Sequence, residues 1–138
     1  MNPSTTSGAT FAGLLLAHLS GDYLLQSHWM ATRKTSAWWP ALSHAAAYTA
    51  CYLPVTRSLL VLAVIGGTHA VIDRYRLARH LVWAKNHLAP ASGRPPAWAS
   101  CSATGYSPDV PTGLAIGLLI VSDNTLHLII NTLAVMWL

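Results

Sequence analysis

Acidic side chains are scarce in this sequence of 138 residues. Glutamate is absent, and the acidic residues are Asp22, Asp73, Asp109 and Asp123. Charged residues make up 9% of the chain, whereas soluble globular domains carry about a quarter. Because 53% of the residues are hydrophobic, the composition excludes an ordinary soluble domain and favours a membrane protein.

Several familiar functional motifs are also missing. The two cysteines, Cys51 and Cys101, show no CxxC spacing, which excludes a disulfide framework and a thiolate zinc site. No basic region precedes the first apolar stretch, so no cleavable targeting peptide is expected. The chain has neither a serine nucleophile elbow nor a glycine-rich phosphate loop, so the catalytic classes that use them are not indicated.

Four apolar stretches predict membrane-spanning helices, each of which needs about 20 mostly apolar residues. The predicted spans cover residues 9–29, 38–54, 57–73 and 111–138. One long helix in place of the short second and third spans is the competing interpretation. Residues 74–110 predict a basic amphipathic helix on the membrane surface, or a simple extension of the third span, and then a proline-rich loop. We expect an all-α polytopic membrane protein, a four-helix transmembrane bundle forming a single domain over residues 1–138.

The lysines and arginines predict the orientation of this bundle. They lie in the loop containing Arg33 and Lys34 and in residues 74–110, whereas Arg57 alone lies in the opposite turn. Positive residues favour the cytoplasmic side, so we expect a cytoplasmic-membrane protein with both termini outside. Membrane lipids are the expected partners, and a small bundle is expected to form a homo-oligomer. Nucleic-acid binding is not expected, because topology already accounts for the basic residues.

Three aspartates within the apolar stretches each have a histidine one helical turn away. His18 precedes Asp22, His69 precedes Asp73, and His127 follows Asp123. Residues four apart share one face of a helix, so each imidazole and carboxylate can reach a common point. The second predicted span adds His44, while Gln26 and Asn131 continue the faces of the first and last pairs. Ionisable groups at membrane depth indicate a functional interior.

Imidazole and carboxylate are the ligands of zinc, manganese and iron(II), and helical bundles commonly host such sites. The sequence therefore predicts one or two divalent ions. The expected ligands are Asp22, His69, Asp73, Asp123 and His127, with His18 and His44 as ligand or general base and Gln26 and Asn131 as orienting groups. A proton or ion pathway, or helix packing alone, would use the same pairs.

The segments that carry these residues resemble a known but uncharacterised family. They are LLLAHLSGDYLLQSHWMATRK, LSHAAAYTA, THAVIDRYR and VSDNTLHLIIN. The family is the domain of unknown function numbered three thousand three hundred and seven, small integral-membrane proteins of bacteria and phages. Its most specific motif, HxxGDxxLQ, is matched by His18, Gly21, Asp22, Leu25 and Gln26. The resemblance implies a fold and a membrane location but no activity. Where relatives commonly have aspartate, this chain has His28, so no acidic ligand is carried over there.

A looser likeness to predicted membrane-bound metal-dependent hydrolases suggests a reaction. We expect a metal-dependent hydrolase that acts on a lipid-borne or membrane-proximal substrate, with the metal acidifying a bound water. Arg74, Arg76 and Arg79 are expected to attract an anionic headgroup. Two alternatives remain open: a proton- or cation-translocating membrane protein, and a phage-related membrane effector that assembles with itself or a host protein.

Overall fold

Helices account for nearly all regular structure in the computed structural model of the chain, which describes residues 3–138, with side chains from residue 10. The chain divides into two units. The first combines the chain up to Tyr75 with His127–Leu138, and the second is Arg76–Leu126.

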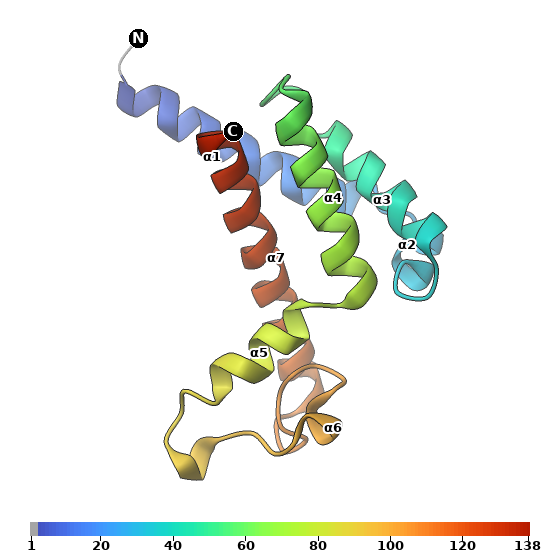
Figure 1. Cartoon of the computed structure of the whole chain (residues 1–138), viewed down its shortest axis with the longest axis vertical. Coiled ribbons are helices and arrows are strands. Elements are labelled where there is room, and N and C mark those ends of the chain that lie inside the picture. Colours follow the sequence, from blue (N-terminus) through green and yellow to red (C-terminus); the bar gives the residue numbers. More distant parts are fainter. Residues whose placement is uncertain (1–2) are drawn as a thin grey trace. The chain divides into compact units, whose positions relative to one another are not determined.

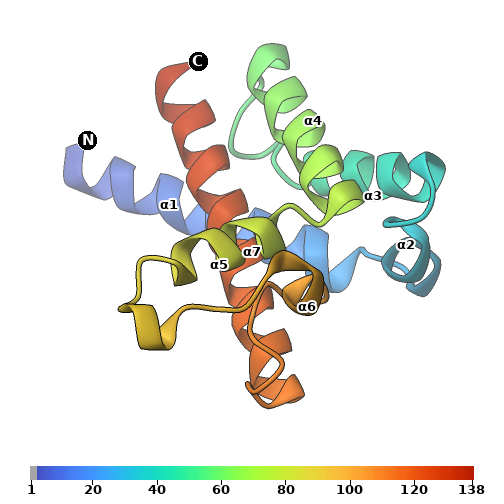
Figure 2. The same ribbon diagram turned by 60° about the horizontal axis from the view of Figure 1, so that its bottom comes forward.

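The first unit is built from the N-terminal helices and the C-terminal end of the last helix (Figure 1). Its elements are α1 (Pro3–Leu19), the π-helical turn η1 (Ser20–Leu24), α2 (His28–Arg33), α3 (Trp38–Ala50), α4 (Leu59–Tyr75) and the end of α7 (Thr112–Trp137). Helices α3 and α4 lie side by side, and α2 folds back beside the start of α3 (Figures 1 and 2). Their apolar core joins all the longer helices through Leu14, Ala17, Tyr48, Tyr52, Val61, Leu62, Ile65 and Ala134.

Short backbone features shape the connection between α1 and α3. The N–H of Leu25 donates to the carbonyl of Ser20 at 3.0 Å, which closes the wide turn of η1. Gly21 is required within this turn, because a Cβ atom there would lie 2.5 Å from Cδ2 of Tyr48. Helix α2 then begins at a side-chain cap, since the hydroxyl of Ser27 accepts from the N–H of Met30 at 3.3 Å.

The second unit packs aromatic rings between a short helix and a loop. Its elements are α5 (Ala78–Asn86), the 3₁₀ turn η2 (Ala91–Gly93), α6 (Trp98–Cys101) and the first part of α7. The ring of Trp98 stacks on His80 at 4.2 Å between centroids, and Trp83 donates to the carbonyl of Pro96 at 3.1 Å. Helix α5 is separate from α4, because Arg76 has a left-handed backbone conformation with φ of 52°.

The predicted four-helix transmembrane bundle is wrong. In the described part of the chain, α7 is the one helix long and apolar enough to cross a membrane, judged by length and composition. The first predicted span, residues 9–29, is broken by η1 and by the turn that precedes α2. Helices α3 and α4 have 13 and 17 residues, below the roughly 20 that a span needs. The multi-pass arrangement with both termini outside therefore loses its support, whereas the fourth predicted span, residues 111–138, coincides with α7.

Adjacent glycines of α4 offer a matched test of the α3–α4 contact. A Cβ at Gly66 would lie 2.5 Å from Oγ1 of Thr49, whereas a Cβ at Gly67 meets nothing within 4 Å. Both alanine variants gain the same helix propensity, so their difference reports crowding. We expect Gly66→Ala to be less stable than Gly67→Ala by about 1–3 kcal/mol in urea unfolding followed by circular dichroism. Equal stabilities would show that α3 and α4 do not pack at this point.

Candidate metal centre

A cluster of polar side chains lies inside the first unit, where an apolar core would be expected. Every longer helix contributes to it. Its buried members are His18 from α1, His44 and Tyr48 from α3, His69 and Asp73 from α4, and His127 and Asn131 from α7. Asp22 of η1 joins them and is 13% exposed. Such a group is stable in an interior only when its members satisfy one another or hold an ion.

Two imidazoles and two carboxylates converge at the middle of this cluster, and we call Asp22, His44, His69 and Asp73 the tetrad. The Nε2 atoms of His44 and His69 are 3.0 Å apart. Nε2 of His44 lies 3.3 Å from both Asp22 Oδ1 and Asp73 Oδ2. Nε2 of His69 lies 3.5 Å from Asp22 Oδ1 and 3.2 Å from Asp73 Oδ2. The residues come from η1, α3 and α4, so tertiary folding assembles the tetrad.

The contacts of His44 exceed what one imidazole nitrogen can satisfy. Its Nε2 faces the three other tetrad atoms and also lies 2.8 Å from Nε2 of Gln26, yet it has one proton or one lone pair to offer. Two ligands bound tetrahedrally at about 2.0–2.1 Å from one ion are roughly 3.3 Å apart. The five tetrad distances, 3.0–3.5 Å, match that separation. These five distances are ones that ligands of a shared cation would have.

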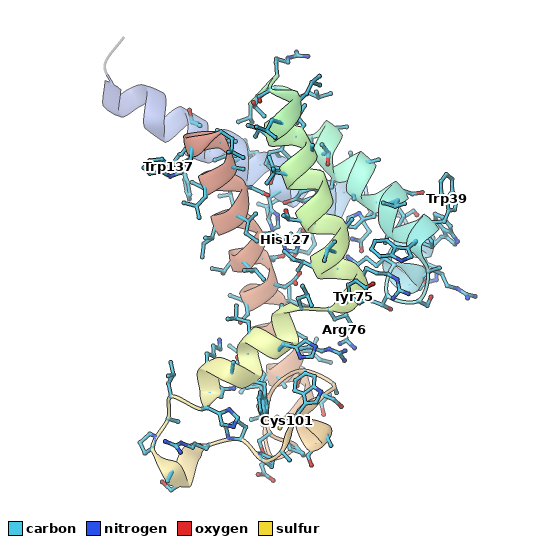
Figure 3. All side chains as sticks on the ribbon, viewed as in Figure 1. Trp39, Tyr75, Arg76, Cys101, His127 and Trp137 are labelled. Carbon is cyan, nitrogen blue, oxygen red and sulfur yellow. The ribbon has the colours of Figure 1, made fainter. Side chains whose placement is uncertain are left out.

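Two groups in the described chain have the geometry to hold a metal ion. One consists of Asp22, His44 and His69, and the other of His69, Asp73 and His127. His127 projects from α7 toward α4 (Figure 3), and its Nε2 lies 3.9 Å from Asp73 Oδ1. Its ring centroid is 4.4 Å from that of His69. The groups share His69, so they form one continuous centre.

A second set of hydrogen bonds, next to the tetrad, joins His18, Tyr48, Tyr52 and Asn131. The Tyr48 hydroxyl lies 2.7 Å from Nδ1 of His18 and 2.9 Å from the Tyr52 hydroxyl. Asn131 donates to both hydroxyls at 2.7 Å. The Tyr48 ring also stacks on His69 at 3.7 Å between centroids, which orients that imidazole. Burial raises the pKa of Tyr52 to about 12 and also raises the pKa of Tyr48, so both hydroxyls are neutral.

Lys34 also belongs to the site. From the sequence, this residue was used only to predict the orientation of the protein in the membrane. Its Nζ donates to Asp73 Oδ2 at 2.7 Å, and its side chain is 18% exposed. Arg74 holds the adjacent loop by donating to the carbonyls of Thr35 and Ser36. Lys34 and Asp73 are 39 residues apart, so no spacing in the sequence signals their contact. Tyr52 was also missed, although it lies four residues after Tyr48, which itself lies four residues after His44, and this spacing could have indicated it.

The charges of the tetrad depend on one another. Burial alone would raise the pKa of Asp73, but hydrogen bonds from His44 and His69 and the nearby Lys34 ammonium bring that pKa well below its usual range. Burial would also raise the pKa of Asp22, but the hydrogen bond from His44 and the nearby imidazoles lower this pKa by more. Both carboxylates are therefore ionised.

The two tetrad imidazoles shift in opposite directions. Burial lowers the pKa of His69 to about 4, with partial compensation from Asp73. For His44 the opposing effect of burial is outweighed by the bonds to Asp22 and Asp73, so its pKa is raised above the usual value. The Nδ1 atoms of both rings are buried without a hydrogen-bond partner in the described chain, so Nε2 makes their polar contacts.

The remaining predicted site residues lie in different surroundings. His18 Nδ1 is 3.5 Å from Asp22 Oδ2, and Gln26 and Asn131 contact His44 and the tyrosines as described. Asp123 belongs to the second unit and is in neither metal-binding group, so its role as a ligand stays a prediction. The three arginines that were predicted to attract lipid headgroups donate hydrogen bonds to backbone carbonyls instead. Arg74 donates to Thr35 and Ser36, Arg76 donates to Ala103, and Arg79 donates to Ser102.

Histidine titration tests this electrostatic assignment. In chelator-treated protein, we expect His69 to stay neutral down to about pH 4 and His44 to stay protonated above pH 6.5. Lowering the pH below 6.5 then destabilises the fold through His69, because the unfolded chain binds that proton more readily, whereas His44 stabilises the fold below 6.5 and loses this effect as the pH rises. NMR of ring protons, assigned with His→Gln variants, measures both. Identical titrations near 6.5 would contradict the assignment.

Comparison with known proteins places this centre in a family. A family described as Protein of unknown function (DUF3307) matches residues 10–91, a segment that contains the whole tetrad and Lys34. No curated protein and no solved structure matches the chain at a significant level. The resemblance seen in the sequence is thereby confirmed for the family, whose description assigns no activity. Because the match covers more than half of the chain, this protein belongs to the DUF3307 family of proteins of unknown function.

Proposed function

We propose that this protein binds a divalent transition metal through Asp22, His44, His69 and Asp73. The observation that carries the proposal is the set of five distances of 3.0–3.5 Å among four ligand atoms from three elements. Two imidazole nitrogens and two carboxylate oxygens suit zinc, manganese or iron(II). A bound ion would also compensate two buried carboxylates, which are otherwise expensive to place in an interior.

One ion at the tetrad accounts best for these contacts. The second group reuses His69, whose Nε2 already faces Asp22, His44 and Asp73. A single imidazole nitrogen binds one ion, so both groups cannot be filled through Nε2 of His69. His127, 3.9 Å from the other oxygen of Asp73, then orients the Asp73 carboxylate in a supporting position.

Hydrolysis is the reaction that we propose for this centre. A bound divalent ion acidifies water and polarises an ester or phosphoryl oxygen. Four protein ligands close a metal site, whereas catalytic sites keep a position for water. Asp22 is the most exposed member of the tetrad at 13%, so it is the ligand that water would replace. In a catalytic centre of this kind, Asp73, His44 and His69 would hold the ion and Asp22 would leave one position to water.

Metal content tests the binding proposal most directly. We expect purified protein to hold zinc or manganese in stoichiometric amount, as measured by mass spectrometry after dialysis. Asp73→Asn should abolish retention and Asp22→Asn should weaken it, because each removes a charged ligand. Asp109→Asn is the matched control, since Asp109 is an exposed acid that hydrogen-bonds Ser107 in the second unit. Circular dichroism confirms that all variants remain helical.

The same preparations separate a structural ion from a catalytic one. Metal-loaded wild type is expected to hydrolyse bis(4-nitrophenyl) phosphate, with turnover lost on chelation and in Asp73→Asn. Binding of metal without turnover of this phosphodiester or of 4-nitrophenyl acetate would reject hydrolysis and leave a structural centre. Wild-type protein that stays empty after zinc and manganese are added would reject the metal site itself.

We also propose that α7 contacts membrane lipid, which would give the centre a lipid-borne or membrane-proximal substrate. Only 11% of the most apolar stretch of this helix is fully buried, and several of its large apolar side chains, such as Val121 and Ile129, are exposed. The helix contains no lysine or arginine between Thr112 and Trp137. Large exposed apolar surfaces are typical of membrane or protein contacts.

Arginine substitution at two exposed positions tests this lipid contact. Val121 lies near the middle of α7 and Leu138 just beyond its end, and they are 61% and 58% exposed. A charge at the centre of a membrane helix costs about 2.5–3.5 kcal/mol, far more than one near its end. We expect Val121→Arg to move the protein from the carbonate-resistant membrane fraction toward the supernatant, and Leu138→Arg to leave it in the membrane. Equal fractionation of both variants would refute insertion of α7.

A further inference from the structure

The side chain of Lys34 lies where an ammonium group would oppose metal binding. Its Nζ is 2.7 Å from Asp73 Oδ2, the same oxygen that faces Nε2 of His44 and Nε2 of His69. The positive charge is thus next to the ligand shell of the proposed ion. Like charges at such distances repel, so a site built only to retain a cation gains nothing from Lys34.

Lys34 is also the part of the centre that reaches the solvent most. Its side chain is 18% exposed, compared with 13% for Asp22 and 6% for Asp73. The backbone around it is held, because the N–H of Lys34 donates to the Met30 carbonyl at 2.9 Å and Arg74 binds the two following carbonyls. The anchored backbone leaves the flexible stem of the side chain to turn from Asp73 toward an incoming group.

The charge of the loaded centre indicates what that group is. A divalent ion and Lys34 together exceed the two tetrad carboxylates by one positive charge when His44 and His69 bind the ion in their neutral form. A phosphodiester carries one negative charge and several oxygens, so one oxygen can meet the ion while another accepts from the ammonium. Lysine is a frequent point-charge partner of phosphate.

We propose that Lys34 is the anion-binding group of this centre and that the substrate is a phosphodiester, held between the ion and the Lys34 ammonium. This inference rests on the proposed metal site and names its substrate class. It assigns Lys34 a contact with the substrate in addition to its ion pair with Asp73.

The test measures zinc and phosphate separately on the full chain. Zinc content is determined by mass spectrometry, and binding of inorganic phosphate to zinc-loaded protein is determined by calorimetry. Lys34→Met should keep its zinc and bind phosphate at least about tenfold more weakly, because a charge-assisted hydrogen bond is lost. Lys34→Arg should restore most of the affinity. Arg33→Met is the matched control, since it removes a neighbouring charge on exposed α2 and should leave the phosphate Kd unchanged.

The zinc content and the phosphate affinity of Lys34→Met test different steps of the inference. Loss of zinc in Lys34→Met would make the Lys34–Asp73 ion pair purely structural, and unchanged phosphate affinity in that variant would remove Lys34 from the anion site. Zinc-loaded wild type that ignores phosphate would also overturn the inference, while leaving the metal site intact. Wild type without zinc would instead reject the metal site on which the inference rests.

A second arm identifies the source of the phosphate group. Dimethyl phosphate, a soluble phosphodiester, and vesicles of phosphatidylglycerol are offered as competitors of inorganic phosphate, with vesicles of phosphatidylcholine, whose headgroup has no net charge, as the control. Competition by phosphatidylglycerol alone would indicate a lipid headgroup, and competition by dimethyl phosphate would indicate a soluble phosphodiester. Either result supports an anionic phosphate ligand at Lys34, whereas competition by neither would contradict it.

Discussion

The buried carboxylate of Asp73 is the interaction on which the first unit depends. Its two oxygens contact side chains from three other parts of the chain, namely His44 on α3, His127 on α7 and Lys34 after α2. An ionised carboxylate in an interior is tolerated only when positive or hydrogen-donating groups surround it. The helices must therefore meet around this one side chain, and the polar cluster sets their relative positions within the unit.

The surroundings of Asp73 explain how the cluster is stable before any ion binds. Lys34 supplies one positive charge next to Asp73, and the hydrogen bonds from His44 to Asp22 and Asp73 raise the pKa of His44, which favours a second positive charge there. Binding of a divalent ion to the imidazole nitrogens would displace the His44 proton, because a metal ligand must be neutral imidazole. Metal binding, the protonation of His44 and the ion pair of Lys34 are therefore coupled, because all three involve the carboxylates of the tetrad.

Apolar packing and polar contacts meet at two tyrosines, one near the end of α3 and one just beyond it. Tyr48 and Tyr52 belong to the apolar core through their rings and to the hydrogen-bond network through their hydroxyls. Gly21 lets η1 approach Tyr48, which brings Asp22 toward His44. The position of the most exposed tetrad ligand thus depends on a glycine in an unusual turn. Wide helical turns of this kind occur frequently at functional sites.

Local periodicity in the sequence was enough to determine the pairs His18–Asp22 and His69–Asp73, because residues four apart on a helix share a face whatever the tertiary structure. It also determined the all-α class and the extent of the last helix. It did not determine the four-span bundle, because an apolar run carries no information about turns such as η1 that break it. The tertiary structure alone decided that Asp22, His44, His69 and Asp73 converge and that Lys34 lies beside them. These contacts depend on the packing of separate helices, and they join residues up to 47 positions apart in the chain.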